Sequence, residues 1–487
     1  MGGVPPVGVA LRGRDPAGRT RLIGLMRVDR GSEVWRLALL GGALLLLLVA
    51  GFGFGTFLAG ESSAESRPST ADGPLSEPSR PQPPRSIDAG VCDLSPGEPF
   101  VGGPTTELVE LGEANGVRVE GAVYPRPDYE GAPWSQWGQG IALADGRFLS
   151  AIGDHIGPDG NSYIYEYDPA TRTLATLGDL LSYIDHEPGS WGHGKVHGQM
   201  VGGPCGEVYF TSYWGTYRDI RFDGTYRGDI LFRLDPELRT IAALGVPVVE
   251  HGVPSLAASG AAALVYGEAI DPFSKASDID EGPFFVYDTD TEQVIFEGPS
   301  IPHSGYRNIM VDSEGRAYYS IGDGQLAVYD PGQNDITTHL SRMPGDWLRA
   351  STTVMPDGRV FGVTREPDMF FVLEPSGEMR SLGEARGYTT SMALHPDGER
   401  FFYIPDAHGG AWVTGAPLIS VDTGTGDQTV VAELNPLVEA RLGLRLGGTY
   451  NIAVAPSGQT VFVGMNAGPL ESDHGFGEVV LLVVHLP

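Results

Sequence analysis

The chain has 487 residues, a formal net charge of -30 and a sequence pI of about 4.6. This acidic balance argues against nucleic-acid partners, because proteins that bind the phosphate backbone carry a Lys/Arg footprint. Hydrophobic residues make up 41% of the chain, which is enough for a buried core. The 70 Gly and 38 Pro indicate many turns, as in an all-β protein built from short strands.

The N-terminal region predicts a membrane anchor. Residues 37–59 (LALLGGALLLLLVAGFGFGTFLA) carry no charge and are long enough to span a bilayer as a helix. Residues 1–36 hold seven Arg against three acidic residues, so we expect them to stay cytoplasmic and the rest of the chain to lie outside. A cleaved signal peptide is the alternative, although its apolar core is usually shorter, about 7–15 residues.

A Ser/Pro-rich stretch at 60–88 predicts a disordered stalk, because it holds too few large apolar residues to bury a core. The folded domain is then expected at 89–487. Its two cysteines, Cys92 and Cys205, both follow the predicted span. They would pair if that side of the membrane is oxidising, and two unrelated thiols are the alternative.

A repeated hairpin begins at Trp137. In each copy an apolar run leads to a turn that ends in Gly, and a second β-rich run follows, as in VMPDGRVFGVT and VAPSGQTVFVG. Asp-Gly and Ser-Gly supply the positive φ that tight hairpins need. The seven turn glycines are Gly146, Gly206, Gly260, Gly315, Gly358, Gly398 and Gly458.

Each of the first six hairpins is followed by another apolar run, an acidic turn and a short strand, as in YIYEYDPATRTLATLG. Each unit therefore has four antiparallel strands, a to d, which is a propeller blade. The seventh unit ends after its third strand, EVVLLVVHLP. The segment TELVELG at 106–112 resembles the fourth strands of other units, so we expect it to close the ring. Two unrelated β-sandwiches are the alternative, but they would not explain seven similar units.

Units such as MALHPDGERFFYI and IAVAPSGQTVFVG resemble the blades of the YVTN-type and streptogramin-lyase-like propeller superfamily. The resemblance covers about residues 105–487 and rests on the pattern of the blades, not on a catalytic signature. It implies a seven-bladed all-β propeller, and by analogy it implies lyase chemistry.

Histidines concentrate in the connections of one face. Strand a starts at the face called top here, so the d-to-a and b-to-c connections lie there. Imidazoles gathered at a channel mouth could bind a divalent metal, or one could act as a general base near neutral pH. We predict His197 and His303, with Arg307, as catalytic residues. The predicted metal ligands are His155, His193, His197, His303 and His408.

Seven residues before six of the hairpin glycines stands a polar residue, and blade three has Val253 instead. The six are Gln139, Gln199, Asn308, Ser351, Ser391 and Asn451. They predict a polar ring at the channel mouth, unless they only satisfy backbone groups of the crowded inner strands. Arg307 and Arg349 stand beside this ring and could bind an anionic group.

The longest top-face connections are expected at 113–137, 179–196 and 214–228, and they are rich in aromatic residues, including Trp191 and Trp214. Such side chains suit a sugar, an aromatic ligand or a peptide, or they form a local core under the loops. The predicted substrate-binding residues are Gln139, Gln199, Asn308, Arg349, Asn451, Trp191 and Trp214. Three functions stay open: a membrane-anchored extracytoplasmic lyase or hydrolase with a divalent metal, a non-catalytic cell-surface module that binds a glycan or a protein, and a structural subunit of an envelope assembly.

Overall fold

The computed structural model describes residues 94–215, 224–259, 262–271, 282–300 and 308–487, and the backbone of two short N-terminal strands. The chain divides into two units, Met1–Pro78 and Ser79–Pro487. In the first unit, β1 (Arg12–Arg14) pairs with β2 (Thr20–Leu22). Among the described residues, no helix is long and apolar enough to cross a membrane. The predicted span at 37–59 and stalk at 60–88 lie outside the described residues, so both stay predictions.

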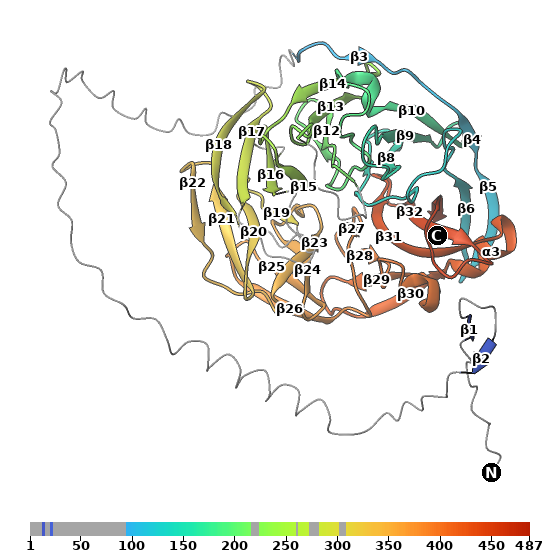
Figure 1. Ribbon diagram of the computed structural model, residues 1–487. Helices are drawn as coiled ribbons and strands as arrows, with labels where there is room; N and C mark the ends of the chain where they lie inside the picture. Colours follow the sequence, from blue (N-terminus) through green and yellow to red (C-terminus); the bar gives the residue numbers. More distant parts are fainter. Residues whose placement is uncertain are drawn as a thin grey trace, which may run out of the picture. The chain divides into compact units, whose positions relative to one another are not determined.

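The second unit is an all-β propeller of seven antiparallel sheets around a central channel, as the sequence predicted (Figure 1). From the channel outward, blade one is β7 (Ile141–Ala142), β8 (Phe148–Gly153), β9 (Ser162–Asp168), β10 (Thr173–Asp179) and β4 (Thr105–Glu107). Blade two is β11 (Val201–Gly202), β12 (Val208–Thr211), β13 (Leu231–Asp235), β14 (Thr240–Gly245) and β3 (Glu98–Pro99). Blade three is β15 (Gly252–Ser259), β16 (Leu264–Ile270), β17 (Gly282–Asp288) and β18 (Gln293–Ser300).

The remaining four blades continue in chain order. Blade four is β19 (Ile309–Val311), β20 (Ala317–Gly322), β21 (Gln325–Asp330) and β22 (Asp335–Thr338). Blade five is β23 (Trp347–Ser351), β24 (Val360–Arg365), β25 (Met369–Leu373) and β26 (Met379–Glu384). Blade six is β27 (Met392–Leu394), β28 (Arg400–Tyr403), β29 (Pro417–Asp422) and β30 (Gln428–Glu433). Blade seven is β31 (Leu444–Val454), β32 (Thr460–Pro469), β33 (Glu478–His485), β6 (Val117–Val123) and β5 (Val109–Ala114).

Short helices lie in the connections between these strands. They are η1 (Leu180–Tyr183), α2 (Ala411–Thr414) and α3 (Asn435–Leu442). Six of the seven predicted turn glycines have a positive φ, between 73° and 90°, as a tight hairpin requires. The seventh, Gly260, lies outside the described residues.

Blade three differs from the predicted register by two residues. The turn hydrogen bond made by Gly146 N–H to Leu143 in blade one is made in blade three by Ala262 N–H to Ser259. The position that corresponds to Gln139 is therefore Ser255 and not Val253. A polar residue thus stands at this register in all seven blades. The sequence-based prediction placed Val253 there, because it took Gly260 and not Ala262 as the turn position of blade three.

An N-terminal strand closes the ring, but it is not the predicted one. The fourth strand of blade seven is β6, which pairs with β33 so that Val123 faces Val480. The predicted closing segment at 106–112 instead contributes to β4 and β5, and β5 forms a fifth strand outside β6. Residues 117–123, predicted as a loop, alternate buried and exposed positions in their first half and fill the gap next to the C-terminal strand.

A buried carboxylate holds this closure. Glu120 in β6 is 2% exposed and accepts hydrogen bonds from Arg118 (2.7 Å), Arg172 (2.5 Å) and His485 (2.9 Å). Burial alone would raise the pKa of Glu120, but the hydrogen bond from His485 and the two arginines lower it overall. The last strand of the chain, the N-terminal strand and blade one are therefore joined at one point.

The segment before β6 runs along the rim of three blades. β3 pairs with β14 of blade two, β4 pairs with β10 of blade one, and β5 belongs to blade seven. This blue segment follows the outer edge of the propeller in Figure 1. It covers the outer edges of these blades, which would otherwise present unpaired backbone groups.

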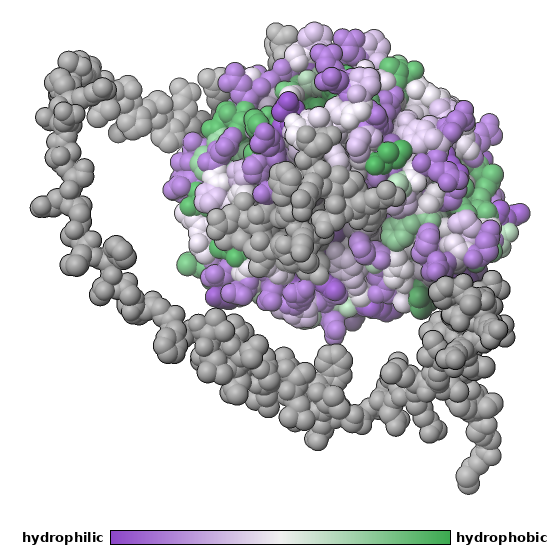
Figure 2. All heavy atoms as spheres, in the orientation of Figure 1, coloured by the Kyte–Doolittle hydropathy of each residue, from purple (hydrophilic) through white to green (hydrophobic). Residues whose placement is uncertain are grey.

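The core of the propeller lies between neighbouring blades. Between blades six and seven, for example, Phe402, Leu446 and Val480 are fully buried and belong to one cluster. On the face shown in Figure 2, hydrophilic residues predominate and hydrophobic residues lie in separate patches. Cys205, in the a-to-b turn of blade two, is disulfide-bonded. The other cysteine of the sequence, Cys92, lies outside the described residues.

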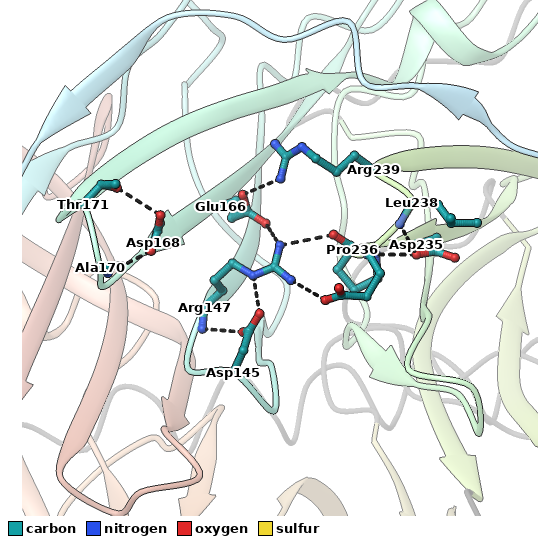
Figure 3. Close-up of polar contacts among 11 residues, drawn as sticks. Asp145, Arg147, Glu166, Asp168, Ala170, Thr171, Asp235, Pro236, Leu238 and Arg239 are labelled. Carbon is teal, nitrogen blue, oxygen red and sulfur yellow. Dashed lines mark hydrogen bonds and ion pairs between the residues drawn. The ribbon is translucent and has the colours of Figure 1, made fainter. Parts of the chain in front are cut away.

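An ion-pair network joins blades one and two on the face of the a-to-b and c-to-d turns (Figure 3). Arg147, whose side chain is 16% exposed, contacts Asp145 (2.5 Å), Glu166 (2.8 Å) and Glu237 (2.9 Å). Glu166 is almost buried and is also contacted by Arg239 at 3.1 Å. Arg147 therefore links strands b and c of its own blade to the outer turn of the next blade.

We predict that Arg147→Met lowers the free energy of unfolding by about 1–3 kcal/mol, because Glu166 loses one of its two cationic partners in a buried position. The measurement is chemical denaturation of the variant and the wild-type protein. As a control, Glu237→Gln should change stability by less than about 0.5 kcal/mol, since Glu237 is 82% exposed. Equal stability of the Arg147→Met variant and the wild type would contradict the role assigned to this network.

Candidate functional site

The predicted site lies at the top of the channel, where the inner strands begin. Two of its predicted residues, His303 and Arg307, lie outside the described residues. Ring residues on neighbouring blades are engaged with the backbone. Gln139 Nε2 donates to the carbonyl oxygens of Met392 (3.4 Å) and Ile452 (3.3 Å), and Asn451 Oδ1 accepts from Gly140 N–H at 2.8 Å.

The other ring residues make similar contacts. Gln199 Oε1 accepts from Leu256 N–H at 3.1 Å, and Ser351 Oγ donates to Asn308 Oδ1 at 2.7 Å. The ring therefore holds the inner strands of neighbouring blades together. This agrees with the alternative that these side chains satisfy backbone groups of the crowded inner strands. The ring also separates two hollows, one above it and one below it.

The upper hollow is a small pocket at the channel mouth. It is lined by Trp137, Gln139, His197, Gln199, Pro254, Arg349, Thr390 and Tyr450. Each lining residue that is not in the ring precedes a ring residue by one or two positions, so the pocket lies on the top side of the ring. It brings together four predicted residues, His197, Gln139, Gln199 and Arg349. Asn308 and Asn451 do not line it.

Arg349 carries a positive charge into this pocket. Its residue is 6% exposed, and its Nε donates to the hydroxyl of Tyr388 at 2.8 Å. Its guanidinium carbon lies 5.4 Å from the centre of the Tyr388 ring and 5.8 Å from that of Tyr450. Among the described residues, no carboxylate forms an ion pair with Arg349. A guanidinium has five N–H donors, and the hydrogen bond to Tyr388 uses the one on Nε.

Trp137 is the centre of an aromatic cluster beside Arg349. Lys195 Nζ lies 4.2 Å from the centre of its ring, and Tyr450 stacks at 4.8 Å in a tilted arrangement. The rings of His408 (5.2 Å) and Phe476 (5.8 Å) complete the cluster. The electron-rich faces of these rings favour a cation above them, so they hold the Lys195 ammonium near the mouth.

His197 and His408 approach the mouth from different blades. His197 Nδ1 lies 3.1 Å from the carbonyl oxygen of Pro254, and its ring contacts Tyr213 at 5.0 Å. His408 Nδ1 lies 2.6 Å from the hydroxyl of Tyr450. His408 keeps an exposed edge, yet partial burial and the charges of Lys195 and Arg349 lower its pKa. It is therefore a neutral imidazole at pH 7, and its tautomer sets the direction of the hydrogen bond with the Tyr450 hydroxyl.

His155 and His193 lie inside the fold, away from the lining of the mouth pocket. His155 is 2% exposed with a φ of 56°, and its Nδ1 is 3.2 Å from the Gly153 carbonyl oxygen. Burial and the charge of Lys195 lower its pKa well below the usual range. His193 Nδ1 lies 2.9 Å from Ser212 Oγ, and burial lowers its pKa to about 4. Both are neutral residues that support the loops.

Trp191 and Trp214 form part of a local core under the top-face loops. Trp191 is 3% exposed, and its Nε1 donates to the carbonyl oxygen of Trp214 at 3.3 Å. Trp214 stacks on Tyr213, with ring centres 3.9 Å apart. Neither tryptophan lines the mouth pocket. These contacts agree with a local core under the loops, which was the alternative to ligand binding for these aromatic residues.

No group of three or more His, Cys, Asp or Glu side chains in the described part of the chain is arranged to hold a metal ion. The four described histidines of the predicted ligand set are divided between the interior and the mouth. The predicted metal site, which includes His303, therefore stays a prediction without support from the described residues.

No family model matches the chain, and no curated protein matches it. Solved propellers are similar to it in fold. Virginiamycin B lyase from Staphylococcus aureus is 10% identical, with 75% of this chain and 99% of that chain covered and a TM-score of 0.48. Oligogalacturonate lyase in complex with manganese is 12% identical, with 79% and 98% covered and a TM-score of 0.47. The WD40 propeller domain of Doa1 is 11% identical, with 74% and 95% covered and a TM-score of 0.45.

The seven-bladed propeller that the blade sequences predicted is confirmed by the order of the strands in the chain's own seven sheets. At identities of 12% or less, these similarities concern the arrangement of blades and not the activity. Lyases and a WD40 domain both occur among these structures. The chemistry of the site must therefore be argued from its own residues.

Sequence reasoning did not assign Pro254 and Thr390 to the site. The signal that finds them is their position one residue before a ring residue, and for Pro254 this requires the correct register of blade three. It also missed the buried acid Asp229, whose pKa burial raises to about 8. Asp229 accepts a hydrogen bond from Tyr226 at 2.7 Å, and nothing in the sequence separates it from an ordinary turn acid.

We predict that His193 makes the protein less stable in acid. Its pKa is about 4 when folded and near 6.5 when unfolded, so its contribution is complete above pH 6.5 and is lost as the pH falls toward 4. The loss is up to about 3 kcal/mol. In His193→Asn, a neutral amide can still accept from the Ser212 hydroxyl. Denaturation at several pH values should give a flatter profile for this variant between pH 6.5 and 4. A parallel profile would show that His193 is not the titrating group.

Proposed function

We propose that the propeller binds a small anionic ligand, or the anionic group of a larger substrate, at the mouth of its channel. The observation that carries this proposal is Arg349, a nearly buried arginine that lines the pocket and forms no ion pair with a carboxylate among the described residues. An unpaired charge in such a position costs stability, so a carboxylate or phosphate that reaches it gains a strong, charge-assisted contact.

The surroundings of Arg349 strengthen this proposal. Lys195 and Arg349 both act on His408, so the mouth has a local positive potential in a chain of net charge -30. The pocket has a volume of about 10 Å³, which is room for about one water-sized group, so only the anionic group of a ligand would enter it. The aromatic faces of Trp137 and Tyr450 would contact the rest of a larger ligand. A wholly acidic surface would repel such a ligand, and the cationic mouth overcomes that repulsion locally.

We predict that Arg349→Met abolishes anion binding without destabilising the fold. Phosphate and citrate should raise the melting temperature of the wild type in a saturable way, because a ligand that binds only the folded state stabilises it. The variant should lose at least about tenfold in affinity, since a charge-assisted bidentate contact contributes about 1.5–3 kcal/mol. Its melting temperature without anion should not fall, because the substitution removes an uncompensated buried charge.

The matched control is Arg359→Met in the same blade, because Arg359 is already paired with Asp357 at 2.7 Å and lies outside the pocket. Its response to phosphate and citrate should equal that of the wild type. If Arg349→Met and Arg359→Met respond alike, the anion does not bind at the mouth. A large loss of stability in Arg349→Met alone would make Arg349 a structural residue.

A second function, lyase or hydrolase chemistry, is favoured by the hydrogen bond between His408 and Tyr450 at this mouth. A neutral imidazole that accepts from a phenolic hydroxyl can take up a proton through that hydroxyl, and two nearby cations would stabilise the resulting negative charge. Such a pair could abstract a proton next to the anionic group that Arg349 binds. A non-catalytic module that binds a glycan or a protein does not need a neutral imidazole at this position.

We predict that NMR titration places the pKa of His408 below 6.5, and that Arg349→Met raises it. The sign follows from the charge, because a neighbouring cation disfavours protonation and its removal restores it. A His408 signal that titrates above pH 7 in the wild type would mean a mainly charged imidazole at neutral pH, which cannot serve as the base. Arg359→Met again serves as the control and should leave the titration unchanged.

The hydrophobic segment at 37–59 supports a further part of the proposal, namely that the propeller is held at the outer surface of a membrane by one N-terminal anchor. In that position the site would meet ligands outside the cytoplasm. The membrane, a small molecule and a glycan or protein ligand are all proposed partners, and a nucleic acid is not.

A further inference from the structure

The lower half of the channel is a second and larger hollow, on the opposite side of the polar ring from the anion pocket. It has a volume of about 440 Å³ and is lined by the inner strands of all seven blades. Gln139 and Gln199 line both hollows, so the ring forms its roof. Its walls run from there to the a-to-b turns.

A single register of the seven inner strands forms an apolar belt in this hollow. The residues four positions before Gly146 and its counterparts all lack a polar side chain. They are Ala142, Gly202, Ala258, Val311, Val354, Leu394 and Val454, and all seven line the cavity. The belt is exposed where it faces the cavity, and Val354, for example, is 36% exposed.

The belt is not symmetric. Blades one to three contribute the small residues Ala142, Gly202 and Ala258, whereas blades four to seven contribute the larger valines and leucine. Small side chains leave room next to the first three blades, so the open space is a slot along one side of the channel. A slot of this kind suits an extended chain better than a globular group.

The described residues that line this hollow include one ionisable group, Asp312. Its charge is already matched by Arg316 at 2.7 Å, and its carboxylate also accepts from the hydroxyl of Tyr318 at 2.8 Å. The ring side chains above are engaged with the backbone or with one another, as described for Gln139, Gln199 and Ser351. The hollow therefore has no group of its own to balance a ligand charge, which distinguishes it from the mouth pocket.

Water in an apolar hollow finds few hydrogen-bond partners, so an apolar ligand displaces it favourably. The volume falls within the range of about 300–1,000 Å³ that is typical of small-molecule sites. The inner edges of the strands offer scattered backbone groups, which can accept or donate to an uncharged polar group but cannot neutralise a full charge.

We propose that the lower channel binds an uncharged ligand with an aliphatic chain, which enters from the face of the a-to-b turns. The chain lies along the belt beside Gly202 and Ala258, and an uncharged polar end such as a hydroxyl stays at the open rim. This site does not depend on the anion pocket, because the two lie on opposite sides of the ring and have opposite chemistry.

The test uses the full chain and the uncharged fluorescent probe N-phenyl-1-naphthylamine. We expect saturable fluorescence enhancement that 1-decanol reverses and that decanoate at pH 8 does not. The variant is Gly202→Leu, because an added Cβ at Gly202 would meet only Ile141 Cδ1, at 3.7 Å, and the leucine would then fill the slot. This variant should lose at least about tenfold in probe affinity, as expected when the volume of an apolar site is filled.

Two controls separate this site from other apolar surfaces, including residues 37–59. Gly332→Leu adds the same side chain on an outer turn, where a Cβ would meet only Asp330 Oδ1, at 3.2 Å, and it should bind the probe like the wild type. Arg349→Met should also leave probe affinity unchanged, which separates this result from any failure of the anion site.

The proposal is overturned if Gly202→Leu binds the probe as tightly as the wild type, or if decanoate displaces the probe as well as 1-decanol does. Melting curves of each variant show whether it is folded. If Gly202→Leu does not fold, Ala258→Leu places the same bulk in the same slot from blade three and decides the question in the same way.

Discussion

The structure depends on the pairing of β33 with β6, which joins the last strand of the chain to a strand near the start of the domain. Without it, blade seven would end at β33 and expose an eight-residue edge of almost wholly buried, aliphatic residues. Glu120 secures the pairing, since a nearly buried carboxylate with three cationic or potentially cationic partners holds β6 in one register against His485 and Arg172.

Closure also positions the inner strands, and with them both hollows of the channel. Each inner strand contributes one polar residue at the same register. Some of these residues bind the backbone of the next blade, as Gln199 does with Leu256, and others bind one another, as Ser351 does with Asn308. The ring therefore divides the channel. Above it lie cationic and aromatic side chains, and below it lies a register of seven residues without a polar side chain. The two halves of the channel are thereby suited to ligands of different chemistry.

Arg349 differs from the other nearly buried arginines of the described domain. Arg147 is matched by three carboxylates and Arg233 by Glu292, whereas Arg349 is 6% exposed and forms no ion pair with a carboxylate of the described residues. Residues at functional sites often depart from the usual packing and pairing of charges, and the rest of the structure offsets the lost stability. The dense aromatic packing around Trp137 and the buried networks between blades provide that compensation here.

The sequence by itself determined the fold class, the number of blades and six of the seven turn positions, because strand alternation and the positive φ of residues such as Gly358 are local properties. It also located Arg349 and the ring, since these follow from counting along one strand. The tertiary structure decided what depends on distant partners. β6 closes the ring because its residues match β33, and Ser255 completes the polar ring because of a two-residue shift in blade three. His155 and His193 turn inward while His197 and His408 reach the mouth, since packing against other blades sets the direction of a loop side chain.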